Sequence, residues 1–81
     1  MEPWSPETLL GIGVRIRAAR EGRGWSQDEF AFRAGVHRSY VTQLENGRKD
    51  LRISTLYRVA DALGVPVVSL LPDLPEPPVG G

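Results

Sequence analysis

The sequence predicts an all-α fold of five short helices, followed by a disordered, proline-rich C-terminal tail. Three observations lead to this prediction. Apolar residues recur three and four positions apart in several segments, which is the period of a helix. Capping residues and glycines separate these segments, and no segment alternates apolar and polar residues as a convincing strand would. The chain has 81 residues, which is the size of one domain with a small hydrophobic core.

The first helix is expected over about residues 6–21, after a loose N-terminal segment at 1–6 that contains two prolines. Its inward-facing residues at helical spacing are Ile12, Ile16 and Ala19. Gly11 and Gly13 should weaken the first turns, each by about 1 kcal/mol relative to alanine. The glycines of "EGRG" (21–24) should end the helix, because glycine adopts the left-handed conformation of a C-cap.

Two short helices are expected next, at about 27–34 and 38–46. Ser26 is a good N-cap for the first of them, and Glu29 completes a capping box. Gly35 should end this helix, so that the next one starts within a few residues. The residues expected to face inward are Phe30, Ala31, Ala34, Val41 and Leu44.

The C-terminal part should hold the last two helices. Ser54 is expected to cap the fourth helix, and Gly64 to close it. Pro66 suits the first position of a final short helix, "PVVSLL". Four prolines in the ten residues 72–81 predict a disordered tail, which leaves 7–71 as the folded domain. The apolar stripe of the fourth helix consists of Leu56, Val59, Ala60 and Leu63.

The composition excludes several classes of site. The sequence has no cysteine and one histidine, so a disulfide and a thiol nucleophile are excluded and a metal site is not expected. The glycine pair of "GIG" does not follow a strand, so it is weak as a nucleotide-binding motif, and we expect neither an enzyme nor a cofactor.

No apolar run reaches the roughly 18 residues of a membrane span, and the acidic start "MEPWSPETLL" is not typical of a signal peptide. A cytoplasmic protein is expected.

The charges are separated along the chain. The net charge is zero and the pI is about 6.6, which argues against a generic nucleic-acid binder. However, all ten basic residues and only five acidic ones lie between Arg15 and Arg58, so this stretch carries +5 and its flanks carry −5. Such segregation can create a basic face on a neutral protein, although solvated helix surfaces would give the same count.

The short turn around Gly35 between the 27–34 and 38–46 helices is the signature of a helix-turn-helix, which presents its second helix to the DNA major groove. The segments "SQDEFAFRAGVHRSYVTQLENG" and "LYRVADALGV" resemble the phage-repressor/Cro type, or XRE family, of DNA-binding domains, and the resemblance covers about residues 9–71. Within this family, "HRSYV" followed by a basic loop is most similar to the controller proteins of restriction–modification systems. The resemblance implies a lambda-repressor-like fold. The features that agree are Arg20, Ser26-Gln27, Ala31, Gly35, Val41, Leu44-Glu45-Asn46-Gly47 and Ala62-Leu63-Gly64.

The outer face of the 38–46 helix is expected to contact bases. Arg38 lies in its first turn, and arginine can bond guanine O6 and N7 in a bidentate way that discriminates by about 1–3 kcal/mol; a solvated surface arginine is the alternative. Gln43 resembles a base-reading position of the phage repressors. Tyr40 resembles a controller-protein tyrosine that lies against the DNA backbone and a thymine methyl, with packing over the fourth helix as the alternative. The expected base contacts are Arg38, Ser39, Tyr40, Thr42 and Gln43.

A second set of residues is expected to contact phosphates. Gln27 begins its helix where the family directs a glutamine at a phosphate, and the helix N-terminus also attracts an anion. His37 is expected to cap the next helix or contact a phosphate rather than to act in catalysis. The basic loop "RKDLRI" supplies most of the remainder, although loop cations are often simply solvated. The expected phosphate contacts are Gln27, His37, Asn46, Arg48, Lys49 and Arg52.

Arg20 and Glu45 resemble the ion pair that ties the first helix to the DNA-reading helix in phage repressors. The last two helices are rich in apolar residues, and an exposed apolar patch there would mark an interface. The resemblance implies a two-fold dimer through this region, although Trp4 and Leu9 folding back over it is an alternative. The residues expected at the dimer interface are Leu63, Val67, Leu70 and Leu71.

The expected function is a sequence-specific dimeric transcriptional regulator that reads a palindromic operator in double-stranded DNA on the nucleoid. Autoregulation and a role as restriction–modification controller follow from the resemblance. The alternative is an antitoxin-like or protein-binding module on the same fold, whose tail at 72–81 binds a protein partner.

Overall fold

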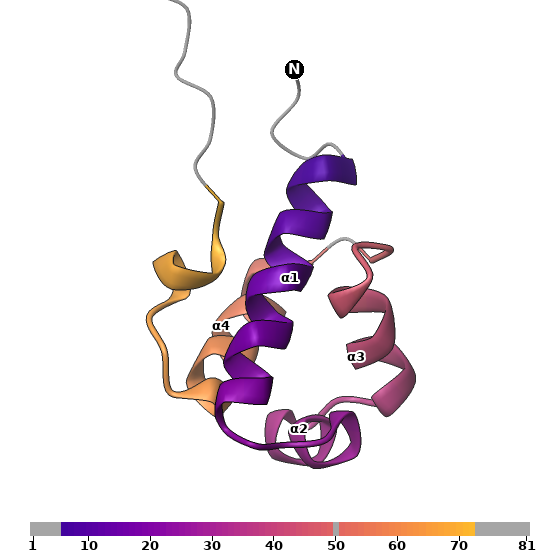
Figure 1. The fold of residues 1–81 in the computed structure, drawn as a ribbon, viewed down its shortest axis with the longest axis vertical. Coiled ribbons are helices and arrows are strands. Elements are labelled where there is room, and N and C mark those ends of the chain that lie inside the picture. The colour runs from indigo at the N-terminus through magenta and orange to yellow at the C-terminus, as the bar shows by residue number, and fades with distance from the viewer. Residues whose placement is uncertain (1–5, 50, 73–81) are drawn as a thin grey trace, which may run out of the picture.

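A computed structural model describes residues 6–49 and 51–72 of the chain. The described part is all-α, as predicted. α1 packs against α3 on one side and the last short helix on the other, while α4 lies behind α1 and α2 crosses one end in the view of Figure 1. The elements are α1 (Pro6–Gly22), α2 (Gln27–Ala34), α3 (Arg38–Glu45), α4 (Ile53–Leu63) and the 3-10 helix η1 (Val67–Leu70).

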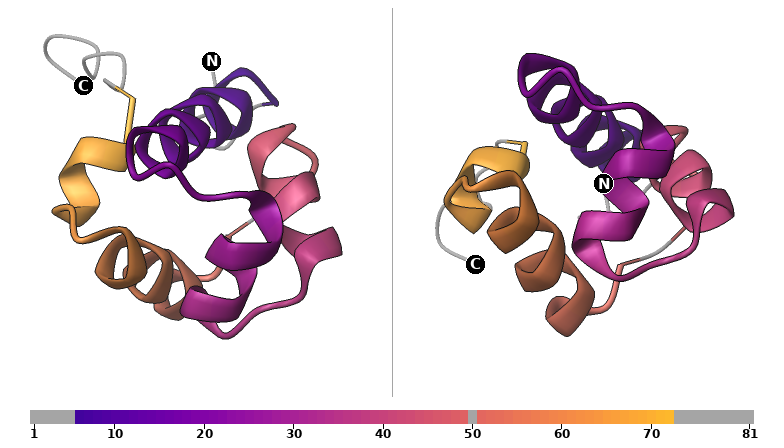
Figure 2. Two further views of the ribbon diagram at one scale, coloured as in Figure 1. Left: turned by 60° about the horizontal axis from the view of Figure 1, so that its bottom comes forward. Right: turned by 90° about the horizontal axis from the view of Figure 1, so that it is seen from below.

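Every helix contributes to one hydrophobic core. Figure 2 shows α2 and α3 on one side and α4 and η1 on the other, and the buried side chains between them come from these helices and from α1. Phe30, Ile16 and Leu63 are among the largest side chains that are completely buried. The core consists of Ile12, Ile16, Phe30, Ala31, Ala34, Val41, Leu44, Leu56, Val59, Ala60, Leu63 and Leu70.

Backbone-to-backbone contact brings α1 against the end of α3. A Cβ atom added at Gly13 would lie 2.7 Å from the carbonyl oxygen of Glu45, and closer still to that of Leu44. Gly47, which has a φ of +68°, approaches the backbone of Leu10 in the same way. The expectation that Gly13 only weakens α1 is therefore incomplete, because this glycine also lets α1 and α3 meet without an intervening side chain.

The ends of α2 follow the sequence signals. The Ser26 hydroxyl accepts a hydrogen bond of 3.0 Å from the Glu29 amide, which satisfies one free N–H group of the first turn. The Glu29 carboxylate lies 3.5 Å from Arg33 instead of closing the predicted capping box. Gly35 ends α2 with a φ of +70°, a left-handed conformation that side chains with a Cβ atom disfavour.

Two predictions for the C-terminal part are corrected. α4 begins at Ile53 with Arg52 at the N-cap, so Ser54 lies inside the first turn rather than capping it. Leu51 and Leu56 flank this start and both pack into the core, the arrangement of a hydrophobic staple that fixes where a helix begins. The final element is a single 3-10 segment rather than an α-helix, with Pro66 as its N-cap.

The predicted N-terminal segment and tail fall almost wholly outside the described residues. Pro72, the first tail residue, is described, and it lies beside Gly11 of α1. Within the described ranges, no helix combines the length and the apolar character that a membrane crossing requires.

Candidate nucleic-acid interface

The turn between α2 and α3 consists of three residues, Gly35, Val36 and His37. The Val36 amide donates a 3.0 Å hydrogen bond back to the Ala31 carbonyl, and the Gly35 amide donates one of 3.2 Å to Phe32. These bonds satisfy carbonyl groups at the end of α2 and reverse the chain tightly. Val36 packs against the core, so the turn is anchored and α3 starts from a defined position.

The outer face of α3 borders an open groove of about 400 Å³. Arg38, Ser39 and Gln43 are exposed there, and Thr42 is half-buried. Their guanidinium, hydroxyl and amide groups can donate and accept hydrogen bonds at the edges of bases. Four of the five predicted base contacts therefore share one surface. The residues that line the groove are Arg38, Ser39, Thr42 and Gln43.

Tyr40, the fifth predicted base contact, lies differently. Its side chain is half-buried and packs against the hydrophobic core, and it does not line the groove of α3. The Lys49 ammonium group lies 6.0 Å from the centre of the Tyr40 ring, within the range of a cation–π contact. Tyr40 therefore connects α3 to the basic loop, and its contact with DNA stays a prediction.

Gln27 is engaged inside the protein. Its side-chain oxygen accepts a 3.1 Å hydrogen bond from the Thr42 hydroxyl, and its side-chain nitrogen donates one of 3.2 Å to Glu45. One N–H of the amide remains for a phosphate, since a glutamine amide carries two. The structure thus gives Gln27 a second role that the sequence did not indicate, which is to connect α2 to α3.

A buried ion pair fixes α3 against α1. Arg20 donates from Nε to Glu45 Oε2 at 2.7 Å and from Nη2 to Glu45 Oε1 at 3.0 Å. Arg20 Nη1 also donates to the Trp25 carbonyl at 2.8 Å. Arg20 is 9% and Glu45 6% exposed. The hydrogen bonds to Glu45 raise the pKa of Arg20 above its usual value, so the guanidinium stays charged.

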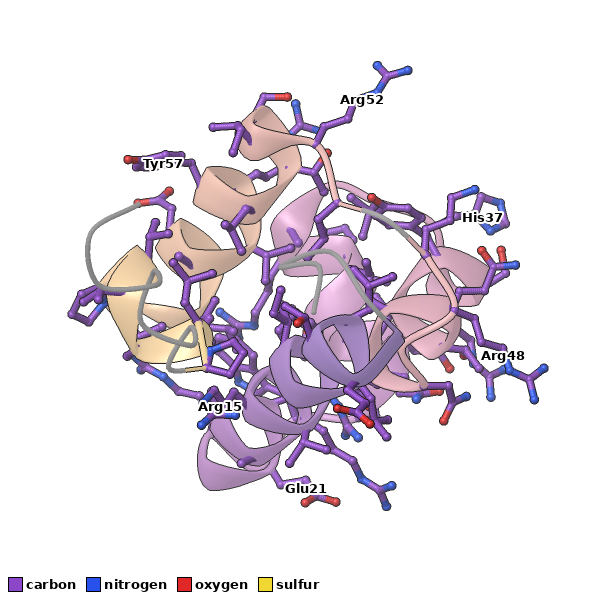
Figure 3. The ribbon with its side chains drawn as sticks, turned by 90° about the horizontal axis from the view of Figure 1, so that it is seen from above. Arg15, Glu21, His37, Arg48, Arg52 and Tyr57 are labelled. Carbon is purple, nitrogen blue, oxygen red and sulfur yellow. The ribbon has the colours of Figure 1, made fainter. Side chains whose placement is uncertain are left out.

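The remaining predicted phosphate contacts are all exposed and flank α3 in the chain. Figure 3 shows His37 and Arg48 projecting on the same side of the molecule, and Arg52 projecting from the start of α4. His37 is the N-cap of α3, but its side chain makes no capping hydrogen bond; its Nδ1 lies 3.4 Å from the Ser39 hydroxyl. The exposed residues of this set are His37, Asn46, Arg48, Lys49 and Arg52.

The predicted dimer interface requires correction at two positions. Leu63 is 0% and Leu70 1% exposed, because both side chains fill the core of their own chain, so they offer no surface to a second copy. Val67 is half-buried and Leu71 is 40% exposed. Other apolar side chains on the last two helices are open to solvent instead: Ile53, Tyr57 and Val68.

One charged contact at the groove was missed by the sequence reasoning. Asp28 Oδ1 of α2 lies 3.5 Å from Arg38 Nε of α3. In the sequence, Asp28 is an acidic residue in the first turn of a helix, where its charge suits the helix dipole. No local pattern could have revealed the contact, because it depends on the angle between the two helices.

Among the described residues, no group of three or more His, Cys, Asp or Glu side chains could hold a metal ion.

Comparisons with known proteins agree with this geometry. A helix-turn-helix family model matches residues 16–70. An uncharacterized HTH-type transcriptional regulator of Sinorhizobium fredii, y4dJ, is 36% identical over 69 residues, which are 85% of this chain and 90% of that protein. The crystal structure of the restriction-modification controller protein C.AhdI from Aeromonas hydrophila is similar with a TM-score of 0.76 at 33% identity, over 78% of this chain and 96% of the other. SinR, a master regulator for biofilm formation crystallised in complex with DNA, is similar with a TM-score of 0.69 at 38% identity, over 73% of this chain and 95% of the other.

Proposed function

Because the chain belongs to the helix-turn-helix family, whose members similar to it include transcription regulators, we propose that it acts as a homodimer that reads a palindromic DNA operator with α3. The observation that carries this proposal is the groove of about 400 Å³ lined by Arg38, Ser39, Thr42 and Gln43. The groove lies on the second helix of a helix-turn-helix, which is the helix that enters the major groove in such domains.

The side chains at the groove suit the edges of bases. Arg38 is 65% exposed along its side chain and lies in the first turn of α3, where recognition helices contact bases. Its guanidinium can bond guanine O6 and N7, and the Gln43 amide can bond adenine N6 and N7. Ser39 and Thr42 can bond any base and therefore contribute less to specificity. We infer that Arg38 and Gln43 carry most of the sequence preference.

Positive and polar side chains around α3 suit the phosphate backbone. Arg48 and Lys49 lie in the loop after α3, His37 precedes the helix, and all three are exposed. Gln27 retains one free N–H at the start of α2, where the helix N-terminus also attracts anions. In this proposal these contacts orient the protein on the duplex and carry no sequence information themselves.

The base-reading proposal is tested by selecting bound sequences from random duplex DNA with the wild type, Arg38→Ala and Gln43→Ala. Each substitution should abolish the preference at one or two base pairs, a loss of about 1–3 kcal/mol of discrimination per pair. Arg48→Ala is the matched control. It should weaken binding to all sequences, lower the slope of log affinity against log salt by about 0.9, and keep the preference. If both α3 variants select the wild-type sequence, α3 does not read the operator.

A dimer is supported by the apolar residues that the last two helices leave exposed. Ile53 and Tyr57 are 70% and 61% exposed and lie one turn apart on α4, while Val68 is 72% and Leu71 40% exposed. Tyr57 projects from the side of the molecule opposite to His37 and Arg48 (Figure 3). Pairing two copies through this patch leaves both α3 helices free for successive major grooves, about 34 Å apart on a palindrome.

Sedimentation at increasing concentration tests the dimer. The wild type should be dimeric at tens of micromolar, and Tyr57→Asp should be monomeric because it places a charge in an apolar contact. Phe32→Asp is the control, since Phe32 is also an exposed apolar residue, at 83%, but lies on α2. A monomeric wild type, or equal effects of the two substitutions, would argue against this interface.

We also propose that the protein controls its own promoter and acts on chromosomal DNA in the cytoplasm, as a controller of a restriction–modification system would. The similarity to C.AhdI supports this role. Binding of the protein to DNA from upstream of its own gene, at the sequence found by selection, tests it. The alternative of a protein partner bound by the tail concerns residues that, apart from Pro72, lie outside the described ranges, and it remains a prediction.

A further inference from the structure

The only cross-helix ion pair that reaches the groove, within the described residues, joins Asp28 to Arg38. Asp28 lies in the first turn of α2 and Arg38 in the first turn of α3. Asp28 Oδ1 is 3.5 Å from Arg38 Nε, and the two side chains are 73% and 65% exposed. The carboxylate therefore lies beside the Nε end of the guanidinium of Arg38, a residue that lines the groove.

We propose that Asp28 is a positioning residue that determines specificity by orienting Arg38 toward a guanine. This inference rests on the proposed function. A guanidinium has five N–H donors in a fixed plane, one of them on Nε. When Asp28 engages Nε, the two terminal nitrogens remain for the paired acceptors O6 and N7 of guanine. Arginine also has many rotamers, so a contact that restrains it before binding reduces the ordering that binding requires.

An exposed ion pair contributes little in water, but its environment changes when DNA covers it. Displacement of water lowers the local dielectric constant and strengthens the attraction between the carboxylate and the guanidinium. The same carboxylate repels the DNA phosphates, so it should weaken binding to every sequence. This loss is offset only at sequences in which Arg38 contacts a guanine. Specificity is the difference between the affinity for those sequences and the affinity for all others.

The next residue along α2 provides a matched control. Glu29 carries the same charge in the same helical turn as Asp28. It pairs with Arg33 at the same distance of 3.5 Å, and these side chains are 44% and 49% exposed. The contact of Glu29 stays within α2, whereas that of Asp28 crosses to α3. Removing either carboxylate removes one negative charge from the first turn of α2, but only the removal of the Asp28 carboxylate releases Arg38.

The experiment uses the full chain and four variants: Asp28→Asn, Glu29→Gln, Asp28→Glu and Arg38→Ala. Each protein is first used to select bound sequences from random duplex DNA. Its affinity is then measured for the preferred operator and for an operator in which the guanine is replaced. Thermal unfolding checks that each variant is folded. Asp28→Asn should reduce the preference for guanine at that position about tenfold, part of the discrimination available to a bidentate contact. Glu29→Gln should keep the preference, and Asp28→Glu should restore most of it. When Arg38→Ala is already present, adding Asp28→Asn should have no further effect on the preference for guanine.

The outcomes separate this inference from the function on which it rests. If Arg38→Ala loses the guanine preference and Asp28→Asn keeps it, the positioning role of Asp28 is wrong and the reading role of Arg38 stands. Equal losses in Asp28→Asn and Glu29→Gln would assign the effect to charge alone and would also overturn the positioning role. A wild type without sequence preference would overturn both proposals.

Discussion

Replacing Arg20 by alanine is expected to lower the free energy of unfolding by about 3–5 kcal/mol, because it leaves a buried carboxylate without its main partner. Glu45 is 6% exposed, and without Arg20 the one side-chain hydrogen bond left to its carboxylate, among the described residues, is that from Gln27. For a domain of this size, whose total stability is about 5–10 kcal/mol, the loss is large. Urea denaturation of the wild type and the variant measures it.

Two further variants decide whether burial of the charges causes this loss of stability. Arg17→Ala removes an ion pair with Glu21 whose side chains are 60% and 56% exposed, and it should change stability by less than about 1 kcal/mol. Replacing both Arg20 and Glu45 by apolar residues of similar volume should recover much of the loss, because no charge is then buried alone. An Arg20→Ala variant as stable as Arg17→Ala would show that the pair does not hold α3 to α1.

Replacing Gly13 by alanine should lower the free energy of unfolding by about 3 kcal/mol, at the upper end of the range for an overpacked site. The added Cβ atom would lie 2.7 Å from the Glu45 carbonyl oxygen and 2.9 Å from its carbon. These are backbone atoms, so α1 and α3 must separate to admit it. Alanine is favoured over glycine within a helix by about 1 kcal/mol, which offsets only part of the loss. The melting temperature should fall by roughly 12–24 °C.

Gly22→Ala is the matched control, because Gly22 also belongs to α1 and a Cβ atom there would meet no atom of the described residues within 4 Å. This variant should be as stable as the wild type or slightly more stable. A Gly13→Ala protein that melts at the wild-type temperature would mean that the approach of α1 to α3 is looser than the structure indicates. Because Gly13 contacts the end of α3, operator binding should weaken together with stability.

Local signals in the sequence were sufficient for most helix boundaries. Ser26, Gly35 and Gly64 act through the backbone of their own turn, so the residue type and its spacing carry the information. The prediction failed where an end depends on packing. α4 starts where Leu51 and Leu56 enter the core rather than at Ser54, and the last segment forms only a 3-10 turn.

The candidate site was predictable only in part, for a related reason. Helical periodicity placed Arg38 and Gln43 on the outer face of the 38–46 helix, because inward-facing residues at helical spacing define the opposite face. The pairing of Arg20 with Glu45, which lie 25 residues apart, came from the resemblance to phage repressors and not from any spacing within the sequence.

The sequence by itself determined the helices, the turn around Gly35 and the polar outer face of α3, because each depends on interactions within a few residues. Only the tertiary structure decided which side chains the helices bring together. It buried Leu63 and Leu70 in their own core, joined Gln27 to Thr42 and placed Asp28 beside Arg38. The physical reason is that these contacts depend on the distances and angles between helices, which the packing of the whole core sets and no local pattern records.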